Sequence, residues 1–318
     1  MKVTDYIDQA KGKTLVSFEI LPPLKGSSIQ SIYSTLDPLM DFKPPFINVT
    51  YHRAEYMYKK NAAGTFEKTI IRKRPGTVGI CAAIINRYHV DAVPHIVCGG
   101  FTEEETEDAL IDLNFLGVDN LLVLRGDPTK NESMFEPEPG GHAHAIDLLK
   151  QAVKMNNGTY LEEELNNGVK TNFCIGVAGY PEKHYEAPNM QMDLAHLKAK
   201  VDAGANYIIT QMFFDNKKFF EFVKLCREAG ITVPIIPGIK PLTQKKQINT
   251  LPRLFNIEIP EQLAVTINKC NDDEAARQVG IESATEQCKE LMQSQIPVLH
   301  FYTMSNAAPV KAIVSKLF

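Results

Sequence analysis

Leu122-Val123-Leu124-Arg125-Gly126-Asp127 is the stretch that decides the fold. Its apolar half has the composition of a buried strand, and a charged Arg-Gly-Asp step directly at the end of such a strand usually lines a site. Further apolar runs along the chain end in the polar groups of Glu19, Thr50-Tyr51, His95 and Gln211. Strands that each deliver a polar group at the same end are typical of the catalytic face of a (β/α)8 barrel. The pattern therefore predicts an α/β TIM barrel and an enzyme.

The chain contains eight strand candidates separated by stretches of helical character. The strands are expected at Leu15–Ile20, Phe46–Tyr51, Ala92–Cys98, Asn120–Leu124, Phe173–Ala178, Tyr207–Met212, Val233–Pro237 and Val298–Tyr302. Thr102 should cap one intervening helix, and Gly204 and Gly230 should end two others. Alternating strands and helices predict parallel pairing, and eight such units predict closure into a barrel. Extra helices fill Lys240–Gln293 before the last strand. No linker divides the chain, so we expect one catalytic domain over residues 1–318.

The composition is that of a globular protein, with 44% apolar and 23% charged residues among 318. A formal net charge of −4 argues against nucleic-acid binding, and the densest basic cluster, Arg72-Lys73-Arg74, is expected on an exposed turn. No apolar stretch reaches the roughly 18 residues of a membrane span, and Met1–Lys13 lacks the apolar core of a secretory signal. The six cysteines form no Cys-x-x-Cys pair, and no group of His and carboxylates has metal-ligand spacing. We therefore expect a cytoplasmic protein without a bound metal.

Two carboxylates are the leading candidates for chemistry. Glu19 lies between two apolar residues, just before Pro22-Pro23, so it is partly withdrawn from water whichever way the strand faces. Such a carboxyl group can keep its proton available near neutral pH, although a strand-end Glu can equally pair with a neighbouring Lys. Asp127 would stabilise a substrate that develops positive charge, but it can also cap a helix or open a turn with Pro128. The residues alone leave these alternatives open.

Several other residues suit an anionic or flat cofactor. The Arg125 guanidinium can donate two hydrogen bonds to one phosphate, and Gly126 lets the backbone come close to a cofactor. The loop 179–184 combines an aromatic ring, a cation and an imidazole, while the Gln211 amide can donate and accept at once, as recognition of a heterocycle requires. The sequence has neither a Gly-x-Gly-x-x-Gly nor a Walker A motif, so a nucleotide cofactor would have to bind without a Rossmann unit.

Taken together, the motifs resemble those of the methylenetetrahydrofolate reductase family, and in particular its bacterial type, which has the catalytic domain only. The matching segments are SFEILPP (17–23), VTY (49–51), PHIVC (94–98), LRGD (124–127), VAGYPEKH (177–184), KVDAGAN (200–206), ITQMFFD (209–215), IIPGI (235–239) and HFYT (300–303). Any one of them alone would say little. Nine in register, over essentially the whole chain, are highly specific.

The resemblance implies bound FAD, NADH or NADPH as reductant, and reduction of 5,10-methylenetetrahydrofolate to 5-methyltetrahydrofolate by ping-pong hydride transfer through the flavin. By the family pattern, Glu19 is the acid that helps to open the imidazolidine ring, and Asp127 stabilises the resulting cation. The family's flavin positions fall on Thr50, Tyr51, His95, Arg125, Gly126, Asp127, Ala145, Tyr180, His184, Ala187, Asp193 and Lys200. Its folate positions fall on Glu19, Asp127, Gln211, Gln247, Leu251 and Tyr302.

The chain departs from the family pattern at several positions. His144 stands where the family often has an aromatic residue, and Leu251 stands where bacterial relatives place a Phe. Asn306 occupies the position of an Arg that is expected to hold the carboxylate of the folate tail, which leaves Lys311 as a candidate substitute. The sequence has no regulatory domain of the eukaryotic kind after the barrel, so inhibition by adenosylmethionine is not expected.

Two alternative functions stay open at this point. A proline-dehydrogenase-like flavoenzyme shares this style of barrel, but it would need an Arg pair for the proline carboxylate. A non-catalytic folate-binding partner subunit would be expected to lack Glu19, Asp127 or Gln211, and all three are present. The sequence favours neither NADH nor NADPH, and it is compatible with a homo-oligomer without indicating the surface that would form it.

Overall fold

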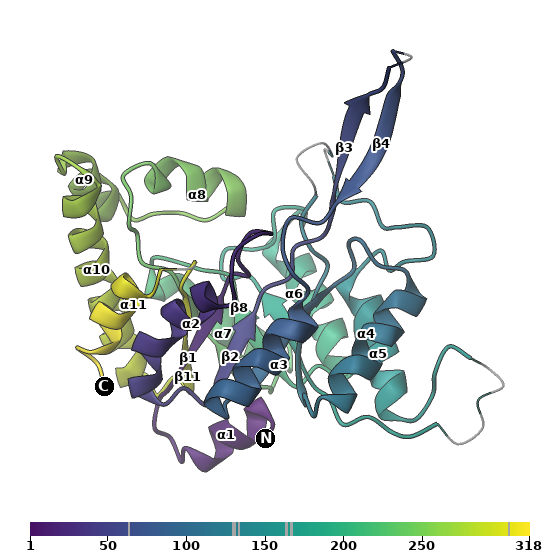
Figure 1. Ribbon diagram of the computed structural model, residues 1–318. Helices are drawn as coiled ribbons and strands as arrows, with labels where there is room; N and C mark the ends of the chain where they lie inside the picture. The colour runs from purple at the N-terminus through teal and green to yellow at the C-terminus, as the bar shows by residue number, and fades with distance from the viewer. Residues whose placement is uncertain (63, 129–131, 133, 163–164, 166–167, 305) are drawn as a thin grey trace.

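The computed structural model describes every residue except 63, 129–131, 133, 163–164, 166–167 and 305. Its centre is a parallel sheet surrounded by helices (Figure 1). The strands of this sheet are β1 (Leu15–Ile20), β2 (Phe46–Val49), β5 (Asp91–Val97), β6 (Asn120–Leu124), β7 (Cys174–Gly179), β8 (Tyr207–Thr210), β9 (Ile235–Ile236), β10 (Gly238–Ile239) and β11 (Val298–Tyr302). Each predicted strand is found, and Thr50, Tyr51 and Gln211 lie just beyond the strand ends rather than within them.

The sheet closes on itself. Its order is β10-β11-β1-β2-β5-β6-β7-β8-β9, and Pro237 alone separates β9 from β10 in the chain. Ile236 of β9 pairs with Ile209 of β8, while Gly238 of β10 pairs with His300 of β11. β9 and β10 are thus two halves of one barrel strand, interrupted by a proline that has no N–H for the ladder. Over the described residues the ring has eight strand positions, and the predicted (β/α)8 barrel is confirmed.

Helices cover the outer face of the ring. They are α2 (Gln30–Leu36), the 3-10 helix η1 (Asp37–Phe42), α3 (Thr77–Tyr88), α4 (Glu103–Phe115), α5 (Ala145–Asn156), α6 (Met190–Asp202), α7 (Asn216–Glu228), α10 (Asp273–Gln293) and α11 (Ala307–Val314). Thr102 caps α4 in a capping box with Glu105, as predicted, because its hydroxyl accepts from the Glu105 N–H. α6 ends just before Gly204, whose φ of 116° favours glycine.

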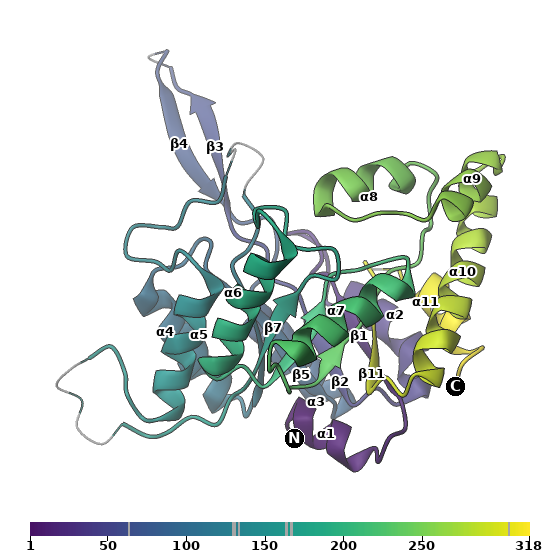
Figure 2. The ribbon, with the colours of Figure 1, turned by 180° about the vertical axis from the view of Figure 1, so that it is seen from behind.

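Two of the extra helices predicted before the last strand lie at the carboxyl end of the barrel. α8 (Gln247–Phe255) stands above the ring, and α9 (Glu261–Lys269) leads from it into the long helix α10 (Figures 1 and 2). The buried side of α8 packs on Met212, which follows β8, and on Leu242, which follows β10. α8 is therefore fixed to the ends of two barrel strands.

The hairpin of β3 (Glu55–Lys60) and β4 (Phe66–Ile71) is not among the predicted elements. Its antiparallel strands project from the barrel beyond β2 (Figures 1 and 2). The tight turn is made by the Asn61 N–H, which donates to the Thr65 carbonyl, and by Gly64 at a φ of 82°. The hairpin returns the chain to the segment after β1, where the Lys25 N–H donates to the Lys73 carbonyl and Arg74 donates to the Pro22 carbonyl. Arg72 and Lys73 are exposed, as expected for the basic run at 72–74, and Arg74 is half-buried.

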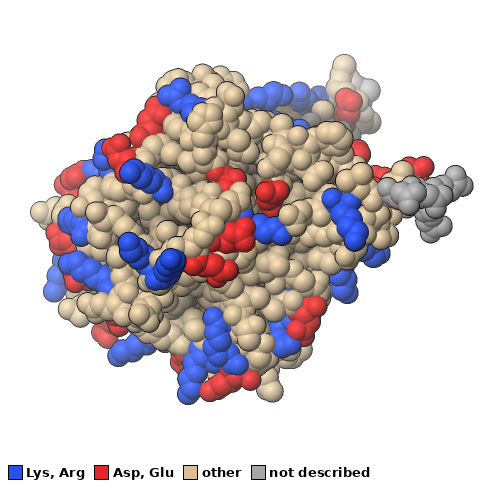
Figure 3. Space-filling view, turned by 90° about the horizontal axis from the view of Figure 1, so that it is seen from below, with Lys and Arg blue, Asp and Glu red and all other residues tan. Residues whose placement is uncertain are grey.

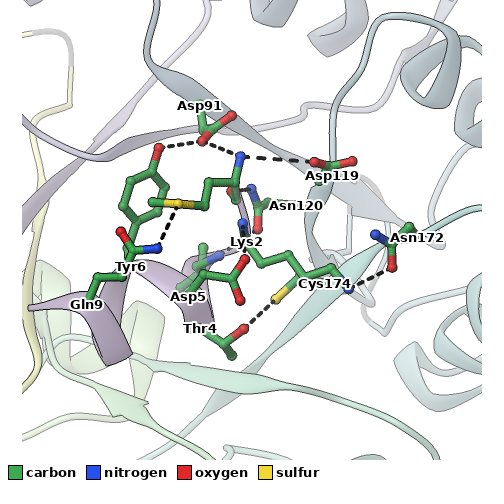
Figure 4. Close-up of polar contacts among 12 residues, drawn as sticks. Lys2, Thr4, Asp5, Tyr6, Gln9, Asp91, Asp119, Asn120, Asn172 and Cys174 are labelled. Carbon is green, nitrogen blue, oxygen red and sulfur yellow. Dashed lines mark hydrogen bonds and ion pairs between the residues drawn. The ribbon is translucent and has the colours of Figure 1, made fainter.

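α1 (Val3–Gln9) covers the amino-terminal end of the barrel, and polar contacts hold it there (Figure 4). The Val3 N–H donates to Asn120 Oδ1 at 2.8 Å, and the Tyr6 hydroxyl donates to Asp91 Oδ2 at 2.6 Å. Asn120 and Asp91 are the first residues of β6 and β5. This end is closed by the chain itself, which leaves the carboxyl-terminal end for a ligand.

Apolar side chains fill the interior above α1. The inward-facing cluster consists of Val3, Phe46, Val93, Leu122, Cys174, Tyr207, Ile209, Ile236 and Val298. Gly176 makes room for the Tyr207 ring, since a Cβ at Gly176 would lie 2.3 Å from that ring. The barrel is consequently a packed core rather than a pore, as is usual for this fold.

The surface carries charges of both signs. Lys and Arg are interspersed with Asp and Glu on the face shown in Figure 3. Within the described chain, no helix combines the length and apolar character needed to cross a membrane. The six cysteines lie in the described part of the chain and are free; all are buried except Cys270, which is half-buried.

Candidate active site

Glu19 lies in a polar layer at the carboxyl-terminal end of the barrel interior. Its Oε2 lies 3.4 Å from His95 Nε2 of β5 and 3.8 Å from His300 Nε2 of β11. Ser17 Oγ and His300 Nδ1 share a hydrogen bond of 2.8 Å, and Asn48 Nδ2 lies 3.3 Å from His95 Nε2. The five residues come from the adjacent strands β11, β1, β2 and β5, so the closed ring is what brings them together.

The basic groups around Glu19 are buried. Burial lowers the pKa of His95 to about 4 despite the opposing effect of the Glu19 carboxylate, so this imidazole is neutral at pH 7 and can accept from Asn48. Lys240 follows β10 and is 8% exposed; burial lowers its pKa, and Glu19 again opposes the shift. Glu19 therefore faces buried imidazoles and a buried ammonium rather than a surface Lys.

Asp127 lies beyond β6 and is exposed. Burial and the Arg74 cation lower the pKa of the His52 imidazole, whereas Glu19 and Asp127 both raise it. Burial also raises the pKa of the Tyr180 hydroxyl, and the charge of Asp127 adds to that effect. Asp127 and Glu19 thus both raise the pKa of the imidazole that follows β2.

The ends of β2 and β6 form a cradle for a flat ligand. Thr50 Oγ1 is buried and has no hydrogen-bond partner among the described residues. The Tyr51 ring packs on Phe101 with ring centroids 5.0 Å apart. Gly126 has a φ of 89°, where a side chain would be strained, and lies against Val97. An unpartnered hydroxyl and a glycine backbone, at the same ends of β2 and β6 on either side of β5, suit a flat ligand that has polar groups at its edge.

Arg125 is already engaged by a carboxylate. Its Nη1 donates to Glu186 Oε2 at 2.6 Å and its Nη2 donates to Glu186 Oε1 at 2.8 Å. The guanidinium also lies 5.1 Å from the centroid of the Phe135 ring. A bidentate fork of this kind has the geometry that a phosphate would use, so an anion at Arg125 would have to compete with Glu186.

The loop after β7 is fastened to α6. The rings of Tyr180 and His184 meet edge to face, with centroids 4.7 Å apart. The His184 N–H donates to Asp193 Oδ2 at 2.8 Å, and the N–H of the buried Ala187 donates to the His184 carbonyl at 3.0 Å. This set of predicted flavin residues therefore forms one connected unit.

Lys200 and Ala145 complete the predicted flavin set. Lys200 Nζ donates to the Ala178 carbonyl of β7 at 3.2 Å, and burial lowers the pKa of Lys200 to about 8 although Asp193 opposes this. Ala145 is the first residue of α5, so it presents the N–H groups that begin that helix. Both residues offer positive charge or N–H donors to an anion.

The predicted folate residues Gln211, Tyr302 and Leu251 lie near one another. The Tyr302 hydroxyl donates to the Thr210 carbonyl at 2.6 Å, next to Gln211. Leu251 of α8 is buried in the cluster with Met212 against which Tyr302 packs. Gln211 Oε1 accepts from the Met212 N–H at 2.9 Å. These contacts place the three residues at the β8–β11 side of the barrel mouth.

Gln247 has a local role in the structure. Its Oε1 accepts from the N–H groups of Thr243 and Gln244 at 2.7 and 3.1 Å, so it fixes the turn that leads into α8. Its amide oxygen is thus used within its own segment. A folate contact by Gln247 stays a prediction.

Several residues around the site were not among the predicted site residues: Ser17, Asn48 and His300 of the polar layer, the buried Lys240 after β10, and His52, which is exposed beyond β2. Lys240 directly follows a strand, so the rule that identified Glu19 could have found it. Asn48 interrupts the apolar run of β2 between Ile47 and Val49, which is unusual for a buried strand. His300 has no such local signal, because its place is set by the pairing of β11 with β1.

A closed parallel barrel with a polar layer at the carboxyl ends of its strands defines an α/β-barrel enzyme. The chain belongs to the methylenetetrahydrofolate reductase family, whose model matches residues 2–318.

Individual relatives agree with the family match. The 5,10-methylenetetrahydrofolate reductase of Escherichia coli is 34% identical over 310 residues, which are 97% of this chain and 92% of that protein. Methylenetetrahydrofolate reductase 1 of Schizosaccharomyces pombe is 33% identical over 100% of this chain but only 48% of its own length. The chain therefore spans about half the length of the eukaryotic relatives that it matches, such as methylenetetrahydrofolate reductase (NADH) 1 of Arabidopsis thaliana, of which it covers 49%.

Solved structures of low sequence identity also resemble this chain, and one of them matches nearly its whole length. It is a Clostridium thermocellum protein described as binding two copies of 5-methyl-5,6,7,8-tetrahydrofolic acid. It is 13% identical, with a TM-score of 0.54 over 98% of this chain and 99% of that one. At this identity the likeness concerns the fold alone.

Proposed function

We propose that the chain reduces 5,10-methylenetetrahydrofolate to 5-methyltetrahydrofolate, with FAD as bound cofactor and NADH or NADPH as reductant in a ping-pong reaction. The observation that carries the proposal is the position of Glu19 in a buried polar layer, within a chain that matches the reductase family over residues 2–318. When bound, the flavin supplies a hydride carrier between nicotinamide and folate.

The residues at the barrel mouth fit a flavin nucleotide. The unpartnered Thr50 hydroxyl and the left-handed Gly126 suit the edge of a planar ring system. Lys200 is a cation that burial disfavours, and an anionic group beside it would restore favourable electrostatics. We assign the cofactor to the predicted set, namely Thr50, Tyr51, His95, Arg125, Gly126, Asp127, Ala145, Tyr180, His184, Ala187, Asp193 and Lys200.

Glu19 would act as the acid that promotes opening of the substrate's five-membered ring. The polar layer suits this role because the His95 imidazole beside Glu19 is neutral at pH 7. Glu19 therefore has a polar neighbour in His95 but no permanent ion pair with it. Asp127 would place a negative charge where the opened, iminium form of the substrate carries a positive one. Gln211, Gln247, Leu251 and Tyr302 would position the folate on the α8 side of the mouth.

The test uses the purified protein and anaerobic spectroscopy. The protein should show a flavin absorbance that NADH or NADPH bleaches and that 5,10-methylenetetrahydrofolate restores, with 5-methyltetrahydrofolate as product. Bleaching by proline would instead favour the proline-dehydrogenase-like function. Binding of folate without any flavin redox cycle would favour the non-catalytic partner subunit.

We also propose that residues 1–318 act as one catalytic domain in the cytoplasm. A single ring accounts for all barrel strands, because β1 pairs with β11 near the opposite end of the chain. The six free cysteines, five of them buried, suit a reducing compartment.

A further inference from the structure

Lys240 is a buried cation at the mouth of the barrel, and the proposed function gives it no role. It directly follows β10 and is only 8% exposed. Within the described part of the chain, its ammonium donates no hydrogen bond and forms no ion pair. A buried charge without a partner is costly, so packing alone does not account for a Lys at this position.

Lys240 belongs to a row of interior side chains that also contains Glu19. Ile239 of β10 pairs with Phe301 of β11, so Lys240 and Tyr302 come next on the two strands. Ile239 and Phe301 belong to the core under the helices, and successive residues of a strand face opposite sides, so Lys240 and Tyr302 face the interior. Tyr302 in turn pairs with Glu19 of β1. The row therefore crosses three adjacent strands.

Only one strand, β11, separates Lys240 from Glu19 in the ring. Neighbouring strands lie about 4.8 Å apart, so the two backbones are about 10 Å apart. Burial lowers the pKa of Lys240, and the Glu19 carboxylate opposes this shift. The charges of the two side chains therefore act on each other although they form no direct ion pair.

The tyrosine between them is fixed and neutral. The Tyr302 hydroxyl donates to the Thr210 carbonyl at 2.6 Å, and its ring crosses β10 at Gly238, where a Cβ would lie 2.3 Å from the hydroxyl oxygen. Burial and the Glu19 carboxylate raise the pKa of this hydroxyl, so it carries no charge at pH 7. Gly238 and Lys240 are two residues apart on one face, so the backbone that carries Lys240 is held beside this ring.

The other titratable groups that face Glu19 are imidazoles. His95 of β5 and His300 of β11 lie 3.4 and 3.8 Å from Glu19 Oε2, and His52 follows β2. Burial lowers the pKa of His95 to about 4 and also lowers that of His52, so these two rings are neutral at pH 7. Lys240 differs from them because the ordinary pKa of its ammonium is 10.5. It therefore supplies a positive charge where the neutral rings supply only dipoles.

We propose that Lys240 is a positioning residue that acts through Glu19, because its ammonium stabilises the carboxylate that Glu19 becomes after giving its proton to the substrate. The inference rests on the proposed function. The proton goes from Glu19 to a nitrogen of the five-membered ring. The bond between that nitrogen and the methylene carbon breaks, its electron pair goes to the nitrogen, and the methylene carbon stays in the iminium. Lys240 keeps its own protons throughout, and its charge favours the release of the proton from Glu19.

The pH dependence of the folate half-reaction tests this role in the flavin-loaded protein. The rate at which 5,10-methylenetetrahydrofolate reoxidises the flavin should fall with rising pH as Glu19 loses its proton. Lys240→Met should move the midpoint of this fall upward by about one pH unit, because a unit charge about 10 Å away has about this effect at an effective dielectric constant of about 20. It should also lower the limiting rate at low pH about threefold, since Glu19 then releases its proton less readily.

Two further variants serve as controls. Lys240→Arg keeps the positive charge, so its midpoint should stay near that of the wild type. Lys246→Met removes an exposed cation from the same segment between β10 and α8, and its pH profile should match the wild type.

A second readout needs neither flavin nor turnover. Infrared spectra of the flavin-free protein, compared with spectra of the same protein carrying Glu19→Gln, isolate the C=O band of the protonated Glu19 carboxyl group. In Lys240→Met this band should persist to a pH about one unit higher than in the wild type.

Three results would overturn the proposal. The first is an unchanged midpoint in both measurements. The second is a raised folate KM with an unchanged midpoint, which would make Lys240 a substrate contact. The third is equal slowing of flavin reduction by NADH or NADPH, which would make it structural. If the wild type does not turn over folate, the proposed function fails instead, and the infrared titration still decides whether Lys240 acts on Glu19.

Discussion

Replacing Lys200 by Met should make the flavin-free protein more stable while weakening its hold on the flavin. Burial lowers the pKa of Lys200 from 10.5 to about 8. The folded chain therefore disfavours the ammonium relative to the unfolded chain. By linkage, lowering the pKa from 10.5 to about 8 costs the folded chain about 3 kcal/mol at pH 7. Loss of the hydrogen bond to the Ala178 carbonyl offsets about 1 kcal/mol of this, so the net gain at pH 7 should be about 2 kcal/mol.

The pH dependence gives the sign of the effect. Below pH 8 the folded and unfolded chains both carry the ammonium, so the wild type bears the whole cost. Between pH 8 and 10.5 the folded chain releases the proton while the unfolded chain keeps it, and wild-type stability rises relative to the variant. At pH 9.5 less than half of the cost remains, and the stability difference between the two proteins should fall to near zero once the lost hydrogen bond is counted.

Urea unfolding of both flavin-free proteins at pH 7 and pH 9.5 measures this difference. Lys198→Met is the matched control, because Lys198 lies on the same helix and pairs with Asp202 near the surface. Equilibrium dialysis at pH 7 compares flavin retention, which should fall in Lys200→Met and not in the control. A stability difference that is the same at both pH values, or a variant less stable than wild type at pH 7, would refute the reasoning.

Three further substitutions test the site and the core. Glu19→Gln should leave the flavin bound and reducible by nicotinamide but slow the folate half-reaction about 10²–10⁴-fold, through loss of the acid; stopped-flow measurements check this, and equal slowing of both halves would make Glu19 structural. Asp127→Asn should raise the reduction potential of the flavin by removing a nearby negative charge; an unchanged midpoint potential in an anaerobic titration would place Asp127 away from the ring. Gly176→Ala should destabilise the fold by about 1–3 kcal/mol, because its Cβ would lie 2.3 Å from the Tyr207 ring, whereas Gly79→Ala, with no atom within 4 Å, should be neutral or stabilising. Urea unfolding midpoints that shift alike for the two glycine variants would contradict this packing argument.

The barrel could be predicted from the sequence because each strand combines an apolar run with a polar residue at its end. The run 122–127 contains both signals, and strand β6 has the predicted bounds. The division of one strand at Pro237 could not be predicted in this way. It depends on a change of pairing partner from β8 to β11, which only the closed ring defines.

The site was predictable where a polar residue lies at the end of an apolar strand and not where closure of the ring alone positions it. Glu19 was accessible to such reasoning, whereas His300 approaches it only because β11 pairs with β1. The basic run at 72–74 was expected on an exposed turn; Arg72 and Lys73 are exposed, whereas Arg74 is half-buried. The hairpin of β3 and β4 that precedes this run was not recognised. Asn61 and Gly64 in its turn were the available signal.

The late pairing of β1 has a consequence for how the protein is made. Ser17 and His300, which share a hydrogen bond across these strands, are 283 residues apart. While the ribosome is still adding the middle of the chain, β11 has not been made. The edge of β1 that will pair with β11 is then unpaired, and the sheet is open. An open strand edge is a template for pairing with another chain, so unfinished or truncated molecules that lack β11 should be the aggregation-prone form of this protein. Once β11 has left the ribosome, it can pair with β1 and close the ring. The same pairing removes the open strand edge and completes the polar layer around Glu19.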